Sequence, residues 1–187
     1  MRPPRALDPE DAAWPSPMRR AAVIVMLRDR DGEAVVSMIV RGDDAPVHSG
    51  QTALPGGRWE PRDGSLIATA LREAEEEVGV TADRLRVIGE LDDLPTRTGF
   101  LVRPVVGVLS GDEPFRPDPR EVQDVFEAPL DAFVDRAGAE ALGIREVGPV
   151  RYPLRAYRAA DRRVWGVAAR VLEVVAALAR GEDPGEE

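Results

Sequence analysis

The chain of 187 residues contains no cysteine, no lysine and a single histidine. The absence of cysteine excludes disulfides, thiol catalysis and zinc sites built from thiolates. The absence of lysine means that all 25 basic side chains are arginines, against 34 acidic ones, which gives a formal net charge of −9. Because a surface that binds nucleic acid is expected to be basic, this balance argues against a nucleic-acid partner.

Long hydrophobic runs are also absent. The apolar stretches are much shorter than a membrane span, and residues 1–20 hold no apolar core of a secretory signal. We therefore expect a cytoplasmic protein that neither crosses nor enters a membrane. With 43% hydrophobic and 32% charged residues, the composition is that of a globular protein. The length predicts one domain that buries about 70% of its unfolded surface.

The composition changes at both ends of the chain. Residues 1–17 hold five prolines and few apolar residues, which predicts a flexible N-terminal arm. Residues 18–180 are predicted to form the single domain, since no internal repeat or second domain is visible. Residues 181–187, GEDPGEE, are predicted to be a frayed acidic tail.

An amphipathic helix is predicted over residues 65–78, which contain neither glycine nor proline. At 100° per residue, Glu73, Glu76 and Glu77 fall on one face, away from the apolar stripe. Glu75 falls near the edge of that stripe. The apolar residues are Ile67, Ala70, Leu71, Ala74 and Val78, and Gly79 is the expected stop.

Three carboxylates on one helix face repel one another, so they require either full solvation or a cation. For an isolated acidic run, solvation is the more common case. The surroundings favour the cation here. Gly56 and Gly57 precede the helix, Asp63 stands at its start, and Arg72 lies beside Glu76.

This combination resembles the signature box of the Nudix hydrolases. The matching residues are Gly57, Arg72-Glu73-Ala74, Glu76-Glu77 and Gly79-Val80. The box normally has a glutamate six residues after the glycine and seven residues between it and the arginine. Here that position is Asp63, and eight residues intervene, a form that resembles the coenzyme A pyrophosphatase branch.

The segment upstream of the box resembles the additional H-x-G-Q-x-x-x-P-G-G motif of the same branch. The matching residues are His48, Gly50, Gln51 and Leu54-Pro55-Gly56-Gly57. Two positions depart from the pattern. Leu54 stands where many members have Phe, and residues 45–47 lack the basic residue that many members have before the histidine.

The resemblance implies an α/β protein, a Nudix-type α/β/α sandwich with a mixed sheet. It implies a Mg²⁺ or Mn²⁺ ion held by carboxylates of the box and the main-chain carbonyl of Gly57. Arg72 is expected to orient Asp63 or Glu76, and Glu121 is a candidate for one further carboxylate. The implied catalytic set is Glu73, Glu76, Glu77, Arg72 and Glu121, the metal set is Gly57, Glu73, Glu76 and Glu77, and the substrate-binding set is Arg41, His48, Gly50 and Gln51.

The other elements are predicted from apolar runs and turn signals. The helices are expected to begin at 129–133 and to span 161–180, with Trp165 as an anchor or pocket wall. In related enzymes a loop such as 92–99 borders the substrate groove. The predicted strands are 21–27 and 34–40, joined by an Asp-Gly turn, followed by 85–91, 102–109, 121–126 and 150–157.

The function implied is hydrolysis of a diphosphate linkage, with coenzyme A or a derivative cleaved to 3′,5′-ADP and 4′-phosphopantetheine. Arg41 is a candidate to contact the 3′-phosphate. The alternatives are a pyrophosphatase for ADP-ribose, nucleoside-diphosphate sugars or nucleotides, and a Nudix-fold binding module without catalysis. The partner is a small diphosphate, and whether the protein forms a homodimer stays open.

Overall fold

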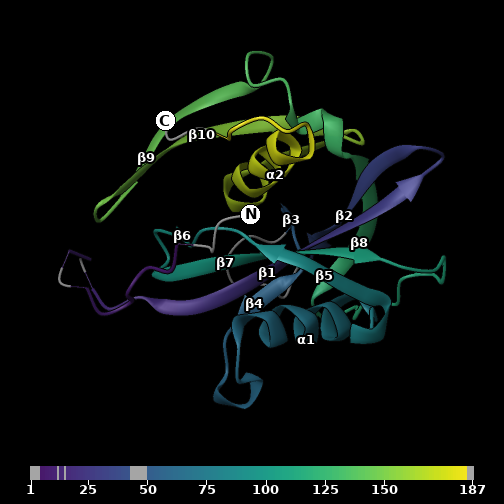
Figure 1. Cartoon of the computed structure of the whole chain (residues 1–187), viewed down its shortest axis with the longest axis horizontal. Helices are drawn as coiled ribbons and strands as arrows, with labels where there is room; N and C mark the ends of the chain where they lie inside the picture. The colour runs from purple at the N-terminus through teal and green to yellow at the C-terminus, as the bar shows by residue number, and fades with distance from the viewer. Residues whose placement is uncertain (1–4, 12, 15, 43–49, 185–187) are drawn as a thin grey trace.

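The computed structural model describes residues 5–11, 13–14, 16–42 and 50–184. It shows a mixed sheet between two helices, with a smaller second sheet beyond one of them (Figure 1). The predicted α/β sandwich is thereby confirmed. The elements are β1 (Arg19–Arg30), β2 (Glu33–Arg41), β3 (Thr52–Ala53), β4 (Gly56–Arg58), η1 (Pro61–Asp63), α1 (Leu66–Val78), η2 (Ala82–Arg84), β5 (Leu85–Glu90), β6 (Leu94–Pro95), β7 (Phe100–Leu109), β8 (Val122–Pro129), η3 (Leu130–Phe133), β9 (Glu140–Val147), β10 (Val150–Ala159), β11 (Arg162–Trp165) and α2 (Gly166–Ala179).

The described strands of the main sheet follow the order β3-β2-β1-β7-β5, and β4, β6 and β8 pair with β1, β7 and β2. β1 and β7 are parallel, and the other pairs are antiparallel. The predicted turn between β1 and β2 is formed by Asp31 and Gly32, both with positive φ, which is the turn geometry that suits the twist of a hairpin.

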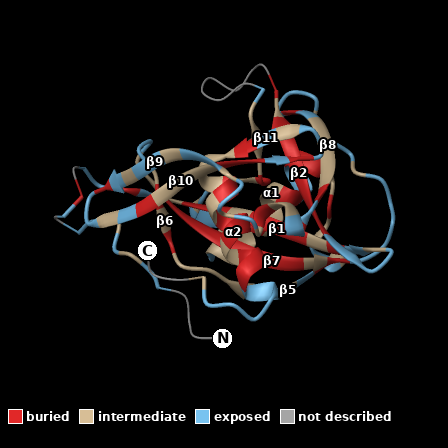
Figure 2. Cartoon of the chain, turned by 90° about the horizontal axis from the view of Figure 1, so that it is seen from above, coloured by how far each residue is buried: buried red, intermediate tan, exposed pale blue. Residues whose placement is uncertain are grey.

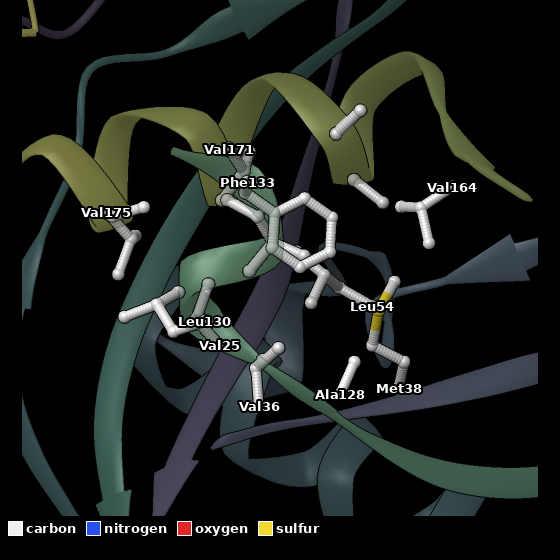
Figure 3. Close-up of a cluster of buried hydrophobic side chains, with 14 of the residues drawn as sticks. Val25, Val36, Met38, Leu54, Ala128, Leu130, Phe133, Val164, Val171 and Val175 are labelled. Atoms are coloured by element: carbon white, nitrogen blue, oxygen red, sulfur yellow. The ribbon is translucent and has the colours of Figure 1, made fainter. Parts of the chain in front are cut away.

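β1 is buried on both faces because helices cover both sides of the sheet. Ile24 and Met26 pack toward α1, whereas Val25 packs toward α2. Figure 2 shows the central strands as largely buried. On the α2 side, Phe133 is fully buried beside Leu54 and Val171 (Figure 3).

The second sheet has the order β11-β10-β9. It includes β9, which is not among the predicted strands, because its residues are mostly exposed and lack an alternating pattern. α2 lies between the two sheets and packs against β10 and β11.

Two predicted helices differ from the structure. The helix predicted for 161–180 begins at Gly166, because Ala160 and Asp161 have positive φ and turn the chain into the β10-β11 hairpin. The helix predicted at 129–133 is a single 3₁₀ turn, η3.

The described part of the N-terminal segment makes specific contacts with the domain. The Leu7 amide donates to Asp93 at 2.9 Å. Trp14 is buried in a small cluster with Met18, Leu101 and Val147. Among the residues described, no helix has the length and hydrophobicity that a membrane crossing requires.

Candidate active site

The position of α1 is fixed at both of its ends. At the start, the Ser65 side chain accepts a hydrogen bond from the Ala68 amide at 3.0 Å, which caps the helix. At the end, Gly79 has a φ of 70° and donates to the Glu75 carbonyl at 3.0 Å. Between them, Ala70 and Ala74 are fully buried against the sheet. This packing sets the height and rotation of the acidic residues relative to β4.

Glu77 is buried rather than solvent-facing. Its side chain accepts a hydrogen bond from the Gly56 amide at 2.9 Å, and the residue is 2% exposed. Burial raises the pKa of Glu77 to about 8, and the nearby charges of Glu73 and Glu121 add to that rise. The predicted position of Glu77 away from the core is therefore wrong, because β4 packs over that part of the helix. Glu75, predicted near the buried stripe, is exposed.

The backbone at Gly56 and Gly57 approaches its neighbours closely. A Cβ at Gly57 would lie 2.4 Å from a carboxylate oxygen of Glu73. At Gly56, which has a φ of 156°, a Cβ would lie 2.4 Å from the Ala22 carbonyl oxygen. Gly56 is thus required by its φ and by contact with the backbone of β1, whereas a side chain at Gly57 would displace the Glu73 carboxylate. The Glu73 carboxylate is held directly against β4, where burial raises its pKa.

Arg72 connects the start of the helix to its acidic face. Its guanidinium donates to Asp63 at 2.8 and 3.2 Å and to Glu76 at 2.7 Å. It also forms an ion pair with Glu73 at 2.8 Å and donates to the Arg58 carbonyl at 3.0 Å. Arg72 therefore contacts both of its expected partners, Asp63 and Glu76, and it contacts Glu73 as well.

Asp63 is held as a carboxylate by the groups around it. Arg72 keeps the pKa of Asp63 well below its usual range, and hydrogen bonds from the Glu60 amide and the Thr69 hydroxyl, both at 2.9 Å, act in the same direction. Its side chain is 3% exposed. Asp63, at the end of the 3₁₀ turn η1, is thus an anchor for Arg72.

Glu121 and Arg41 come to this site from distant parts of the sequence. Glu121 directly precedes β8, and its carbonyl accepts from the Gly42 amide at 2.8 Å. Its charge contributes to the raised pKa values of Glu73 and Glu77, whereas the charge of Arg41 opposes the rise at Glu77. The structure thereby brings together Glu73, Glu76, Glu77, Arg72, Glu121, Arg41 and Gly57.

The upstream motif is described only in part. His48 lies outside the described residues. Gly50 and Gln51 are held against the end of β2 by hydrogen bonds of 2.9 and 3.0 Å with the backbone of Arg41. Gln51 lines the pocket described below, and Gly50 does not.

A pocket of about 490 Å³ opens beside Gly56 and Gly57 and extends between the main sheet and the second sheet. The loop of residues 96–98 lines it, in agreement with the expectation that residues 92–99 border the substrate groove, and Trp165 forms part of its wall. Sequence reasoning missed Arg97 and Arg145, which also line it. Neither belongs to a motif, and the fold alone brings them together.

The donor set at α1 suits a hard divalent cation, since it consists of carboxylate and carbonyl oxygens. Among the described residues, no group of three acidic side chains already converges in metal-ligand geometry. Arg72 instead draws Glu73 and Glu76 toward itself. Burial and the neighbouring charges of Glu73 and Glu121 disfavour the ionised form of Glu77. A dication would offset both effects, so the residues fit such an ion.

The fold and the acidic helix face agree with the comparison to known families. The chain matches the NUDIX domain family over residues 18–147, and it belongs to the Nudix hydrolases. It is 35% identical over 158 residues to the uncharacterized Nudix hydrolase NudL of Yersinia pestis (strain Pestoides F), covering 84% of this chain and 78% of that one. NudL of Yersinia pseudotuberculosis serotype I (strain IP32953) gives the same values.

Solved structures show the same fold at lower sequence identity. A NUDIX hydrolase from Alicyclobacillus acidocaldarius superposes with a TM-score of 0.57 at 18% identity, covering 90% of this chain and 98% of that one. A MutT/nudix family protein from Enterococcus faecalis gives a TM-score of 0.56 at 20% identity, covering 88% and 62%. The family assignment supports a hydrolase of diphosphate linkages, and enzymes of this family generally use divalent cations.

Proposed function

We propose that the protein hydrolyses the diphosphate linkage of coenzyme A or a coenzyme A derivative, with Mg²⁺ or Mn²⁺, to 3′,5′-ADP and 4′-phosphopantetheine. One observation carries this proposal. The pocket is lined by Gln51 and Gly56 of the upstream motif and by Gly57, at which the box begins. The two segments that resemble the coenzyme A branch thus border one cavity, where a single substrate can contact both.

The ion would be held by Glu73, Glu76, Glu77 and the main-chain carbonyl of Gly57. When bound, it would neutralise charge on the phosphate oxygens and lower the pKa of water. The chain contributes the positions of these ligands. The Gly56 amide fixes one oxygen of Glu77, and Arg72 fixes Glu76.

The remaining residues of the site act around the scissile linkage. Arg41 lines the pocket and lies close enough to Glu77 to affect its pKa, so its positive charge is available to a phosphate near the metal face. Glu121, exposed and near both Glu73 and Glu77, supplies the further carboxylate of the site. Gln51, which lies next to Arg41, offers its side-chain amide to the bound substrate.

A panel of diphosphates with identified products tests this proposal. The panel consists of coenzyme A, dephospho-coenzyme A, ADP-ribose, UDP-glucose and ATP, each tested with Mg²⁺ and with Mn²⁺. The products are separated and identified by mass spectrometry. We expect the highest kcat/KM for a coenzyme A species, with 3′,5′-ADP among the products. A higher kcat/KM for ADP-ribose or UDP-glucose would contradict the assignment of coenzyme A as the substrate. If none of the five compounds were hydrolysed, the alternative of a Nudix-fold binding module without catalysis would be supported.

A further inference from the structure

The pocket is positively charged although the chain as a whole is acidic. Its described lining includes Arg41, Arg58, Arg97 and Arg145, and no Asp or Glu. In the whole chain, acidic residues outnumber basic ones by 34 to 25. A cavity with this lining creates the local positive potential that a polyanionic ligand requires. Arg58 directly follows Gly57 and Arg41 lies near Glu77, so these two arginines belong to the end of the pocket at the proposed metal ligands. Arg97 and Arg145 do not belong to this end.

Arg97 lies at the end of the pocket that is remote from Gly57. Gly57 pairs with Ala22, and Ala22 pairs with Arg103 of β7. β7 begins three residues earlier, at Phe100, which is about 10 Å along a strand. The turn that carries Arg97 precedes Phe100. Its guanidinium therefore belongs to a part of the cavity beyond the scissile linkage.

Arg145 is held at the same end by the second sheet. It is the cross-strand partner of Tyr152, whose hydroxyl donates to the Pro95 carbonyl at 2.8 Å. Pro95 lies two residues before Arg97, so this bond ties both arginines to one place, where the hairpin of β9 and β10 approaches β6 (Figures 1 and 2). Burial raises the pKa of Tyr152, and the charges of Arg145 and Arg97 are among those that oppose the rise.

Within the described ranges of the chain, the two guanidinium groups have no acidic partner. In the part of the chain that the structure describes, neither Arg97 nor Arg145 forms a hydrogen bond or ion pair with another side chain. Most other arginines on the same sheets are paired, as Arg151 is with Glu146 at 3.2 Å. Two like charges beside one cavity repel each other, and a bound anion stabilises both.

The remaining wall of the pocket is apolar and partly aromatic. Phe100, Leu154 and Trp165 line it, and the Arg19 guanidinium lies 4.0 Å from the centre of the Phe100 ring. A flat heterocycle or a sugar fits such a wall, with anionic groups on either side of it.

We propose that Arg97 and Arg145 bind a second anionic group of the substrate, a phosphate monoester separate from the diphosphate that is cleaved beside Glu73 and Glu77. This inference rests on the proposed function, in which the adenosine carries a 3′-phosphate. It assigns that phosphate to these two arginines in place of Arg41, whose charge faces Glu77. Each guanidinium can donate two parallel hydrogen bonds to a phosphate.

The experiment measures binding and hydrolysis with pairs of molecules that differ only in this phosphate. Calorimetry compares 3′,5′-ADP with 5′-AMP, and kinetics compare coenzyme A with dephospho-coenzyme A. The variants are Arg97→Ala, Arg145→Ala and the double variant. Arg158→Ala is the matched control, because Arg158 is exposed on β10 and does not line the pocket. Thermal melts verify that each variant is folded.

We expect the wild-type protein to bind 3′,5′-ADP more tightly than 5′-AMP, and to hydrolyse coenzyme A with a higher kcat/KM than dephospho-coenzyme A. The double substitution should reduce both preference ratios by at least about tenfold, because hydrogen bonds to a charged group are lost. Arg158→Ala should leave them unchanged. Equal wild-type affinity for 3′,5′-ADP and 5′-AMP, or ratios that survive the double substitution, would overturn the inference.

The failure of this inference differs from the failure of the proposed function. Coenzyme A hydrolysis with ratios that do not depend on Arg97 and Arg145 removes the inference and leaves the function. A preference for 3′,5′-ADP that depends on both arginines, without hydrolysis of any coenzyme A species, supports the second-phosphate site and removes the proposed reaction.

Discussion

Glu75 and Glu77 are two residues apart on α1 and have opposite environments. Glu75 is exposed, whereas Glu77 is 2% exposed and bonded to the Gly56 amide. A helical wheel places a residue relative to the apolar stripe alone, so it does not include a strand that covers the polar face. The residue types of the site could be predicted from the sequence, and the burial of Glu77 could not, because it depends on where β4 returns to β1.

Substitution of Glu77 by Gln should abolish most turnover without loss of the fold. The amide oxygen of Gln can still accept from Gly56, while a charged metal ligand is removed. We expect kcat to fall by at least about 100-fold, since the loss of a positioned electrostatic group costs that order. Without metal we expect a melting temperature close to that of the wild type, because the raised pKa of Glu77 already leaves this buried side chain largely uncharged at neutral pH.

Glu75→Gln is the control for this substitution, since it makes the same chemical change on the same helix at an exposed position. It should retain full turnover. Kinetics on a diphosphate substrate and calorimetric melts give both quantities. Full activity in Glu77→Gln would show that the residue is not a metal ligand.

Asp63 contributes stability that depends on pH. Its pKa is lowered in the folded protein, mainly by Arg72, so its contribution is full above the unfolded pKa of about 3.9 and is lost as pH falls toward the folded pKa. Asp63→Asn should destabilise the protein by about 2 kcal/mol at pH 7. The difference in the free energy of unfolding between the wild type and Asp63→Asn should become smaller by about 1 kcal/mol as pH falls from 5 to 3. Urea unfolding at each pH measures it, and a gap that stays constant or widens would contradict the prediction.

At the scale of elements, α1 could be predicted closely because local signals agree. Its periodicity, its Ser65 cap and its Gly79 stop all lie within the segment. The start of α2 could not be predicted, because residues 162–165 pair as a strand with β10. The apolar periodicity of the residues that follow does not indicate this pairing. β9 could not be predicted for a similar reason, because it is stabilised by pairing with β10 and has few buried side chains of its own, whereas β10 itself agrees with the strand predicted at 150–157.

The C-terminal stop of α1 gives a prediction at this scale. Gly79 and Gly64 both have a φ of 70°, but a Cβ at Gly79 would lie 2.8 Å from the Cβ of Arg116, whereas nothing lies within 4 Å of one at Gly64. Gly64→Ala should therefore show only the backbone strain of about 1 kcal/mol, and Gly79→Ala about 1 to 2 kcal/mol more.

Chemical unfolding of the two variants separates strain from contact. Because the last turn of α1 carries Glu76 and Glu77, Gly79→Ala should also lower turnover, while Gly64→Ala should change it little. Equal losses of stability in the two variants would show that the segment with Arg116 moves away without cost.

At the scale of the whole molecule, an acidic protein carries out chemistry on an anionic substrate by separating its charges. Carboxylates gather on α1, while the pocket lining holds four arginines and, among the described residues, no acidic side chain. The net charge of −9 by itself predicts poor phosphate binding. Only the arrangement of β6, β9 and β10 around the pocket shows where the positive potential lies, and this arrangement depends on pairings between distant segments.

Bound metal should raise the stability of the whole domain. A divalent cation that binds the native state alone stabilises it by mass action, by about 2.7 kcal/mol when its concentration is 100 times Kd. We therefore expect Mg²⁺ or Mn²⁺ at millimolar concentration to raise the melting temperature measured by calorimetry, and EDTA to reverse the rise. Glu77→Gln should abolish the shift and Glu75→Gln should preserve it. An equal rise in both variants would show that the ion binds elsewhere on this acidic surface, because general screening does not distinguish a buried carboxylate from an exposed one on the same helix.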